Sequence, residues 1–392
     1  MPLTGIKVID LTRILSGPFC TMLLADMGAE AIKIEPPREG DPLRTQGAMR
    51  DGLSWYYASF NRNKKSVTLD LYSPEGKEIL ESLIRKSDVV VDNFRPGVME
   101  KMGFGYARLK DIKSDIVYCG ISGFGKGGPY KDRPAFDFII QAMSGLMSLN
   151  GKEGEEPIRV GIPISDLIGG LYAAFGIAVA LCNRSKTGQG QQIEASLLDG
   201  IMSFFAYMSA NYFATGQLTR RTGNDHPIIA PYGVFRAKDG DIAIAPSSEQ
   251  IYQKFIESLG LIHLNQDVDF MTNERRMANR ERTNALIQEK IGTQSREYWI
   301  EYLNRSGIPC GIIMNLNEVF NDPQVQHQQM VLEIDHPGYG RVRMTGFPVK
   351  LSSTPCQVRL PAPRLGEHTV EVLKELGMTP ETFSALRRRG II

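Results

Sequence analysis

Short runs of β-branched residues alternate with amphipathic stretches along the first 200 residues of the chain. The strand-like runs are I-K-V-I-D-L at residues 6–11, A-I-K-I at 31–34, S-V-T-L at 66–69 and V-V-V-D at 89–92. Between the last two runs, residues 73–87 have the apolar spacing of an amphipathic helix. This alternation predicts an α/β fold with a mostly parallel sheet covered by helices.

Flanking residues mark the ends of two predicted helices. Ser73, followed by Pro74 and Glu75, has the character of an N-cap before a first helical turn. Gly28 follows the stretch that should form the first helix, and glycine is common just past a helix C-terminus. We therefore expect one helix to end near residue 27 and another to begin after Ser73.

The pattern changes between residues 224 and 307. Hairpin-like strands with Asp239-Gly240 as their turn are followed there by three charged helical segments. After Gly307 the chain returns to short strands, loops and a final helix. We predict a large Rossmann-like domain that starts with residues 1–220, a smaller α+β domain at 224–312, and a return of residues 313–392 to the large domain.

The charge balance argues against two classes of partner. The formal net charge is +1, so no long-range field attracts nucleic acid or an anionic membrane. The basic clusters at residues 220–221 and 387–389 are short, and we interpret them as solvated surface. Neither nucleic acid nor a membrane is expected as a partner.

Cysteine and histidine usage suggests a cytoplasmic protein without a metal. The five cysteines are odd in number and never form C-x-x-C, as expected of thiols kept reduced inside a cell. All five histidines follow residue 225 without paired ligand spacing, so no metal site is predicted. The N-terminus leads directly into a strand-like run, and the apolar segment 167–182 is shorter than the roughly 20 residues of a membrane span.

Two familiar catalytic patterns are disfavoured. The cluster G-F-G-K-G-G at residues 123–128 matches G-x-G-x-x-G, but Pro129 and loop-like residues follow where a dinucleotide site needs a helix. We interpret this cluster as an active-site or structural loop. The chain has no G-x-S-x-G elbow, and no histidine in its first 225 residues could partner a serine there.

Asp166 is an isolated acid at the start of an apolar segment. Pro163 and Ser165 precede it, so it should lie in the first turn of a helix, where the backbone N–H groups favour its ionised form. Gly169 and its neighbours would let a ligand or another backbone approach closely. Asp166 either only caps a buried helix or serves as a poorly hydrated nucleophile.

A set of motifs containing Asp166 resembles the family III CoA-transferases (CaiB/BaiF type) over essentially the whole chain. The motifs follow in order as V-I-D-L-T-R-I-L-S-G-P-F, G-A-E-A-I-K-I-E-P-P, N-R-N-K-K-S, D-N-F-R-P-G, S-G-F-G, S-D-L-I-G-G, K-T-G-Q-G-Q, G-I-P-C-G and L-G-E-H-T. The resemblance implies an interlocked homodimer and coenzyme A, delivered as an acyl-CoA, as a substrate. In its implied mechanism, Asp166 attacks a thioester to form a mixed anhydride and then carries CoA as an aspartyl thioester.

The resemblance also implies binding residues. Phe136, Asp137 and Gly169 would contact the acyl substrate. A further set would bind CoA: Leu15, Ser16, Arg38, Leu69, Tyr72, Asn93, Phe94, Arg95 and Lys101.

Departures from relatives limit the specificity. Formyl-CoA transferase has a glutamine where this chain has Leu15, which argues against formyl-CoA or oxalate. The segments at residues 210–217 and 223–232 look more like the glutarate-type dicarboxylate transferases, with succinyl-CoA as the donor. Arg13, Arg44 and Arg62 are candidates for the distal carboxylate of a dicarboxylic acid.

Two alternatives stay open at this point. An α-methylacyl-CoA racemase shares the fold, but its second proton carrier is a histidine that aligns with Phe136, which cannot carry a proton. A CoA-binding protein without turnover is the other alternative, although it would have no need of a desolvated acid at position 166.

Overall fold

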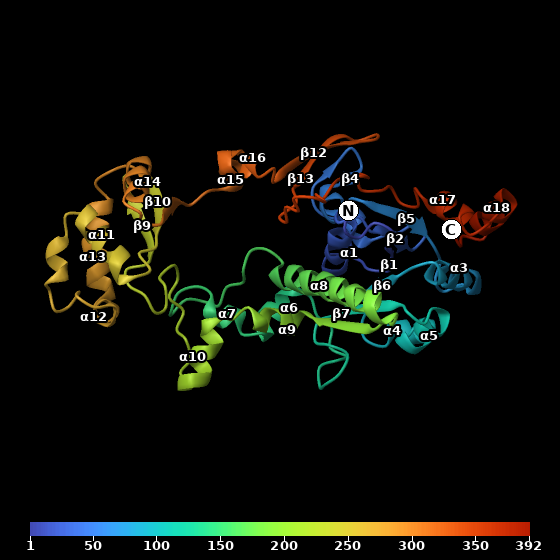
Figure 1. The fold of residues 1–392 in the computed structure, drawn as a ribbon, viewed down its shortest axis with the longest axis horizontal. Helices are drawn as coiled ribbons and strands as arrows, with labels where there is room; N and C mark the ends of the chain where they lie inside the picture. Colours follow the sequence, from blue (N-terminus) through green and yellow to red (C-terminus); the bar gives the residue numbers. More distant parts are fainter. The chain divides into compact units, whose positions relative to one another are not determined.

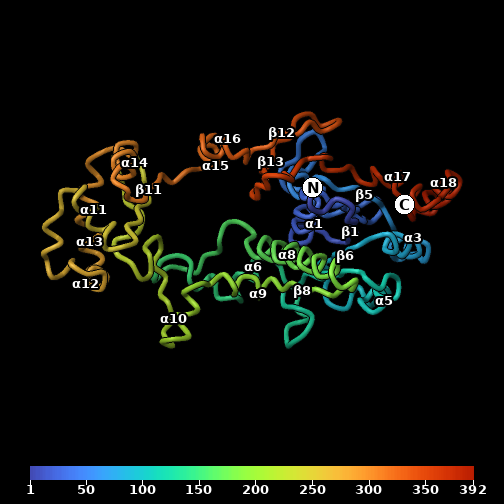
Figure 2. The backbone as a smooth tube through the Cα atoms, in the orientation of Figure 1, coloured from blue at the N-terminus to red at the C-terminus, as the bar shows by residue number.

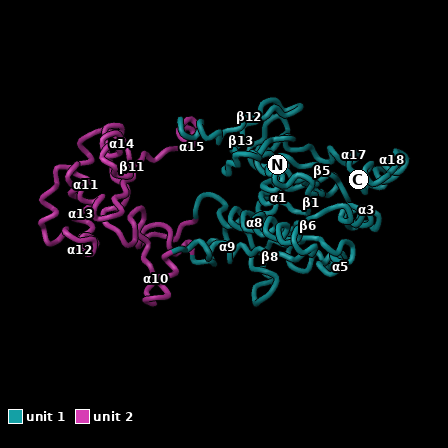
Figure 3. Tube along the Cα trace, in the orientation of Figure 1, with its two compact units in different colours: residues 1–145, 160–206, 323–392 teal, residues 146–159, 207–322 magenta.

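The computed structural model describes residues 1–392, which form two compact units (Figure 3). Unit 1 comprises residues 1–145, 160–206 and 323–392, and unit 2 comprises residues 146–159 and 207–322. Unit 2 therefore begins earlier and ends later than the predicted domain of residues 224–312. The chain passes between the units four times, and its path can be followed in Figure 2. The single change of sequence pattern near residue 224 could therefore not reveal all the boundaries of unit 2.

A six-stranded parallel sheet in the order β5-β2-β1-β6-β7-β8 forms the centre of unit 1 (Figure 1). Val8 of β1 lies opposite Ala31 of β2 on one side and Val89 of β6 on the other. This is the 3-2-1-4-5-6 order of doubly wound sheets, which reverses between β1 and β6. The predicted α/β fold with a parallel sheet is confirmed. The strands are β1 (Lys7–Asp10), β2 (Glu30–Glu35), β5 (Lys64–Thr68), β6 (Val89–Asp92), β7 (Val117–Ser122) and β8 (Gln192–Ser196).

Helices cover both faces of this sheet because its strands are apolar on both sides. Helices α1 (Ser16–Asp26) and α8 (Ile164–Thr187) pack against each other and against the strands. Ile9, Ile32 and Val90 belong to a second hydrophobic layer, which five other helices complete. The four longer ones are α3 (Pro74–Arg85), α5 (Tyr106–Ile112), α17 (Thr369–Lys374) and α18 (Pro380–Arg388).

Two glycines allow α8 to approach its neighbours closely. A Cβ atom on Gly170 would lie 2.4 Å from the carbonyl oxygen of Ser16, at the start of α1. A Cβ atom on Gly169 would lie 2.3 Å from a methyl carbon of Leu197 in α9 (Leu197–Ser203). A larger residue at position 170 would force α8 away from the α1 backbone, whereas one at position 169 would require the Leu197 side chain to move.

Helix α8 is longer than the apolar segment from which it was predicted. It has 24 residues, and on length and composition alone it could cross a membrane. Half of its most apolar window is buried inside the structure, a pattern that the core helix of a globular protein shares. Leu171, Phe175 and Val179 are exposed along one face of the helix.

Buried polar contacts attach the C-terminal segment to unit 1. The guanidinium of Arg62 forms an ion pair with Asp26 at 2.7 Å and donates to the Thr345 carbonyl oxygen at 2.9 Å. The Asn63 side chain donates to the Gln357 carbonyl oxygen at 2.8 Å. The other elements of this unit are η1 (Pro42–Thr45), β3 (Met49–Arg50), β4 (Leu53–Ser54), α2 (Trp55–Asn61), α4 (Val98–Met102), α6 (Asp137–Met143), α16 (Pro323–His327), β12 (Val331–His336) and β13 (Gly340–Thr345).

Unit 2 has its own core around a three-stranded antiparallel sheet in the order β11-β10-β9. The predicted hairpin is present, but its turn is Lys238-Asp239, because Gly240 already pairs with Ala237 as the first residue of β10. Its elements are α7 (Leu146–Leu149), α10 (Tyr207–Thr215), β9 (Gly233–Ala237), β10 (Gly240–Ile244), α11 (Glu249–Ser258), η2 (Ile262–Asn265), α12 (Asn273–Ala278), α13 (Arg280–Ile291), α14 (Arg296–Arg305), β11 (Cys310–Ile312) and α15 (Leu316–Asn321).

Candidate functional site

A cavity of about 790 Å³ lies in unit 1 at the carboxyl ends of the parallel strands. Residues at or just after the end of every strand line it, including Leu11 after β1, Asn93 after β6 and Leu197 after β8. Open α/β sheets bind ligands at this edge, where the strand order reverses. The topology of the sheet therefore makes this cavity the candidate site.

The cavity has a cationic lining. Six of its basic side chains take part in no ion pair of the structure. Of its four acids, Glu35 and Asp41 are paired with Arg44 and Lys33, which leaves only Asp70 and Asp166 unpaired. Such a lining suits a ligand that carries several phosphates. The six are Arg13, Lys77, Arg95, Lys101, Lys131 and Arg133.

The cavity contains all but one of the residues expected to bind CoA. Leu15, Ser16 and Leu69 are buried in its wall, whereas the Tyr72 side chain is exposed. The remaining four are Asn93, Phe94, Arg95 and Lys101.

Arg38 is the exception. It has a left-handed backbone with φ of 72°, and its guanidinium lies 3.7 Å from where a Cβ of Gly390 would be, outside the cavity lining. The sequence could not reveal this, because the loop after β2 turns at Arg38 toward the C-terminus of the chain.

Asp166 lies in the first turn of α8 and lines the cavity. Its half-buried carboxylate makes no hydrogen bond and no ion pair in the structure. Burial, and then the negative charge of Asp137, raise the pKa of Asp166 to about 7. An unpaired acid with a raised pKa in a cavity wall is a candidate functional residue, since a buried structural acid is usually hydrogen-bonded.

Asp137 forms hydrogen bonds to the first turn of α8. Its Oδ1 accepts hydrogen bonds from the Ser165 N–H at 2.9 Å and the Ser165 hydroxyl at 2.8 Å, and its Oδ2 accepts from Gln141 at 2.8 Å. The carboxylate is buried and is not part of the cavity lining, which differs from the expectation that Asp137 contacts the acyl substrate. Phe136 does line the cavity, whereas Gly169 packs under Leu197.

Sequence reasoning missed two features of the site. Burial and the charges of Asp166 and Asp137 raise the pKa of the Tyr56 phenol, so this side chain of α2 lies within electrostatic range of both acids. Lys131 and Arg133 follow the glycine cluster, whose own Gly123 and Phe124 line the cavity. Their position directly after an expected active-site loop was the sequence signal that could have predicted these two cations. Tyr56 had none, because only the fold brings α2 to α8.

No group of three or more His, Cys, Asp or Glu side chains among residues 1–392 is arranged to hold a metal ion.

Comparison with known proteins identifies the family. The model of CoA-transferase family III matches residues 3–369. The human succinyl-CoA:glutarate CoA-transferase is 38% identical over 96% of this chain and 86% of its own length. Acetyl-CoA:oxalate CoA-transferase from Acetobacter aceti is also 38% identical, over 95% of both chains.

Structural comparison agrees. A CaiB/BaiF family protein from Brucella suis has a TM-score of 0.85 at 37% identity, and the match covers 96% of this chain and 99% of that one. With the cavity, the cationic lining and Asp166 in place, the comparisons show that the chain is a CoA-transferase and belongs to CoA-transferase family III.

Proposed function

We propose that this protein moves CoA from succinyl-CoA to a short-chain carboxylic or dicarboxylic acid through covalent intermediates on Asp166. The observation that carries this proposal is the unpaired carboxylate at the cavity wall, with its pKa raised to about 7. The donor is inferred from similarity, since the human relative is named for succinyl-CoA and glutarate.

The proposed reaction runs through two anhydrides. An Asp166 oxygen attacks the thioester carbon of the donor, the C–S bond breaks, and CoA leaves as a thiolate. The thiolate then attacks the aspartyl carbon of the mixed anhydride, which releases the donor acid and leaves an aspartyl-CoA thioester. The acceptor carboxylate attacks that thioester, whose C–S bond breaks to release the CoA thiolate and give a second anhydride. The thiolate then attacks the acceptor carbonyl carbon, which forms the new acyl-CoA and restores the Asp166 carboxylate.

The environment of Asp166 favours this chemistry over simple capping. A carboxylate with a pKa near 7 is more basic than an ordinary aspartate, yet about half of it is ionised at neutral pH. Because it has no hydrogen-bond donor to displace, its oxygens are free to attack an acyl carbon. Removal of bulk water around the bound thioester would protect the intermediates from hydrolysis.

We place CoA along the carboxyl edge of the sheet. Five of the six unpaired cations of the lining, all except Arg13, would neutralise its phosphates, and the apolar wall around Leu15 and Leu69 would face its pantetheine chain. Asp137 would act through Ser165, which it anchors beside Asp166, and Phe136 would bound the acyl end of the cavity.

Arg13 is the proposed partner for the distal carboxylate of a dicarboxylic acceptor. The other two candidates are occupied: Arg44 binds Glu35 and the Tyr57 hydroxyl, and the buried Arg62 binds Asp26. Arg13 lines the cavity, where its guanidinium lies 5.0 Å from the centre of the Phe94 ring. It is therefore the candidate whose charge is still available to an anion.

We also propose that the protein is an interlocked homodimer in the cytoplasm. The apolar face of α8 formed by Leu171, Phe175 and Val179 is the kind of surface that oligomers cover. All five cysteines are free, which fits a reducing compartment.

The racemase alternative is weaker. Phe136 occupies the wall where a second proton carrier would be needed, and it cannot exchange a proton. A CoA-binding protein without turnover has no use for an unpaired acid at the wall, so the transferase proposal explains more of the site.

Replacing Asp166 by Ala should reduce transfer by at least about a thousandfold while CoA still binds. The measurement is mass spectrometry of new thioesters formed from succinyl-CoA and a panel of acids including glutarate, mesaconate, oxalate and carnitine. Asp199→Ala is the matched control, because Asp199 is also an acid in the first turn of a helix but lies outside the cavity lining. Transfer retained by the Asp166 variant would contradict the assignment.

The kcat/KM for the donor should rise about tenfold per pH unit below pH 7 and level off above it, because only ionised Asp166 attacks. Asp137→Asn should move this acidic limb of the pH profile, the rise of kcat/KM below pH 7, to lower pH, because the substitution removes a negative charge near Asp166. The limb should stay above the ordinary aspartate value of 3.8, since burial is the larger cause of the shift. A limb that does not move in the variant would mean that Asp137 does not influence the nucleophile.

Arg13→Gln should raise the KM for a dicarboxylate acceptor about 10- to 100-fold, the loss expected for a charge-assisted hydrogen bond. The KM for succinyl-CoA, whose free carboxylate would occupy the same position, should rise as well, whereas the KM for a monocarboxylate acceptor and for a donor without a distal carboxylate, such as acetyl-CoA, should change little. Arg133→Gln is the comparison variant, and there the KM for the CoA donor should rise instead. If Arg13→Gln changes only the donor KM, Arg13 is a CoA residue and this proposal is wrong.

Light scattering should give twice the chain mass of 43.6 kDa. Because interlocked chains cannot separate without unfolding, a mixture of tagged and untagged dimers should form no hybrids until both are unfolded and refolded together. A monomeric mass would rule out the dimer, and hybrids formed under native conditions would rule out the interlocking.

A further inference from the structure

The turn between β1 and α1 has an unusual backbone. Residues 12–14 lie in this turn, and Leu15 and Ser16, which line the cavity, follow directly. Ile14 has a φ of 67°, in the left-handed region that β-branched residues strongly avoid. Such a conformation persists only where the surroundings force it, so the contacts of this turn are informative.

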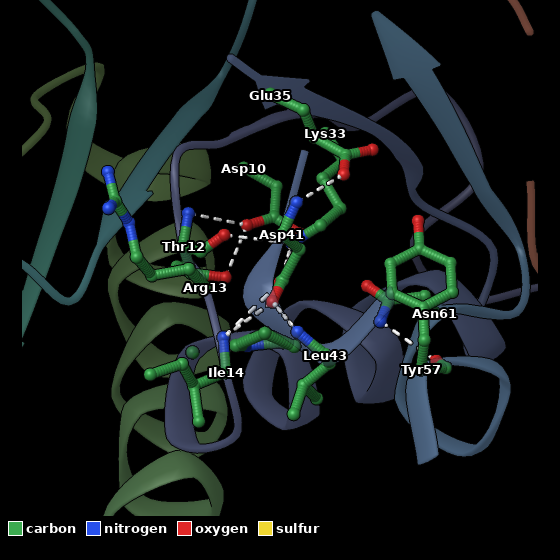
Figure 4. A network of polar contacts seen from close by, with 12 residues as sticks. Asp10, Thr12, Arg13, Ile14, Lys33, Glu35, Asp41, Leu43, Tyr57 and Asn61 are labelled. Atoms are coloured by element: carbon green, nitrogen blue, oxygen red, sulfur yellow. Dashed lines mark hydrogen bonds and ion pairs between the residues drawn. The ribbon is translucent and has the colours of Figure 1, made fainter. Parts of the chain in front are cut away.

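Side chains from other segments bind the backbone of the whole turn (Figure 4). Asp10 accepts from the Thr12 N–H at 2.9 Å, and Lys33 donates to the Thr12 carbonyl oxygen at 2.8 Å. The Asn93 amide accepts from the Arg13 N–H at 2.9 Å and donates to the Arg13 carbonyl oxygen at 2.8 Å. The turn is therefore held by side chains rather than by backbone partners.

Asp41 supplies the contact at the strained residue. Its Oδ1 accepts from the Ile14 N–H at 3.1 Å and from the Leu43 N–H at 2.9 Å. Its Oδ2 forms an ion pair with Lys33 at 2.9 Å, and both side chains are completely buried. The Asp41 N–H in turn donates to Glu35 at 2.9 Å. A buried charge pair contributes little net stability, so its value here is to fix one geometry.

The segment that follows the turn contacts α8 directly. The Ser16 carbonyl oxygen, two residues after Ile14, faces Gly170, one helical turn beyond Asp166. Because no side chain separates the two backbones, a displacement of Ser16 moves the wall of the cavity relative to the carboxylate of Asp166.

We propose that Asp41 is a positioning residue for the transfer reaction: it holds Ile14 in the left-handed conformation and thereby sets Leu15 and Ser16 against α8 beside Asp166. This inference rests on the proposed function. Asp41 acts through the backbone of Ile14, so glycine at position 14, which adopts positive φ without strain, should make Asp41 dispensable.

Asp41→Asn should lower the kcat of transfer about 10- to 100-fold, the effect of a displacement near 1 Å at a reacting centre, with a smaller change in CoA affinity. Adding Ile14→Gly to Asp41→Asn should restore most of the loss, measured against the Ile14→Gly variant alone. Asp26→Asn is the control for stability, because Asp26 is another buried carboxylate with a cationic partner but lies outside the cavity. Asp26→Asn should lower the melting temperature of the protein but leave kcat unchanged at temperatures below the unfolding transition.

A second variant covers the case in which Asp41→Asn does not fold. Asp41→Leu combined with Lys33→Met removes both buried charges together, which cores tolerate better than one unpaired charge. It should fold and show the same loss of kcat.

The outcomes separate this inference from the proposed function. If the wild type forms new thioesters and Ile14→Gly gives no rescue, Asp41 is only structural and the inference is wrong. If the wild type forms none, the proposed function fails, and a crystal structure of the Asp41→Asn variant still decides the conformational part. Ile14 should leave the left-handed region there, and an unchanged Ile14 would overturn the inference.

Discussion

Burial of one unpaired carboxylate is the constraint on which the rest of the site depends. Asp166 is partly removed from water without a hydrogen-bond donor or a cation, an arrangement that disfavours its charged form and raises its pKa to about 7. The fold tolerates this because α8 is fixed independently of the acid. Gly170 lets the helix contact Ser16 of α1 directly, and Asp137 satisfies the Ser165 N–H in place of the catalytic candidate.

Buried charged side chains of two kinds therefore lie at the carboxyl edge of the sheet. The pairs Lys33–Asp41 and Lys64–Asp10 are fully buried, fully partnered and rigid, and they fix the backbone that surrounds the cavity. Asp166 is the opposite case, since it has no partner, and we propose that a substrate becomes its partner. The cations of the lining are a third group, exposed to the cavity and proposed to bind the phosphates of CoA.

Much of this structure could be predicted because local signals and the fold agree. The β-branched runs gave the strands, and Ser73 caps α3 through the Gly76 N–H as its sequence context predicts. The position of Asp166 in the first turn of a helix followed from its neighbours. The role of Asp41 and the proximity of Tyr56 depend on segments far apart in the chain, which no periodicity reports. The sequence also could not show that Arg38 would turn away from the cavity.

The most direct test of the account is to trap the covalent intermediate. The enzyme is incubated with succinyl-CoA in the absence of an acceptor, treated with borohydride, which reduces a thioester to an alcohol, and analysed by peptide mass spectrometry. The account predicts a reduced side chain at Asp166 alone, and none without succinyl-CoA. Reduction at another residue, or an unmodified Asp166 in enzyme that transfers CoA, would contradict the central claim that this carboxylate carries the CoA.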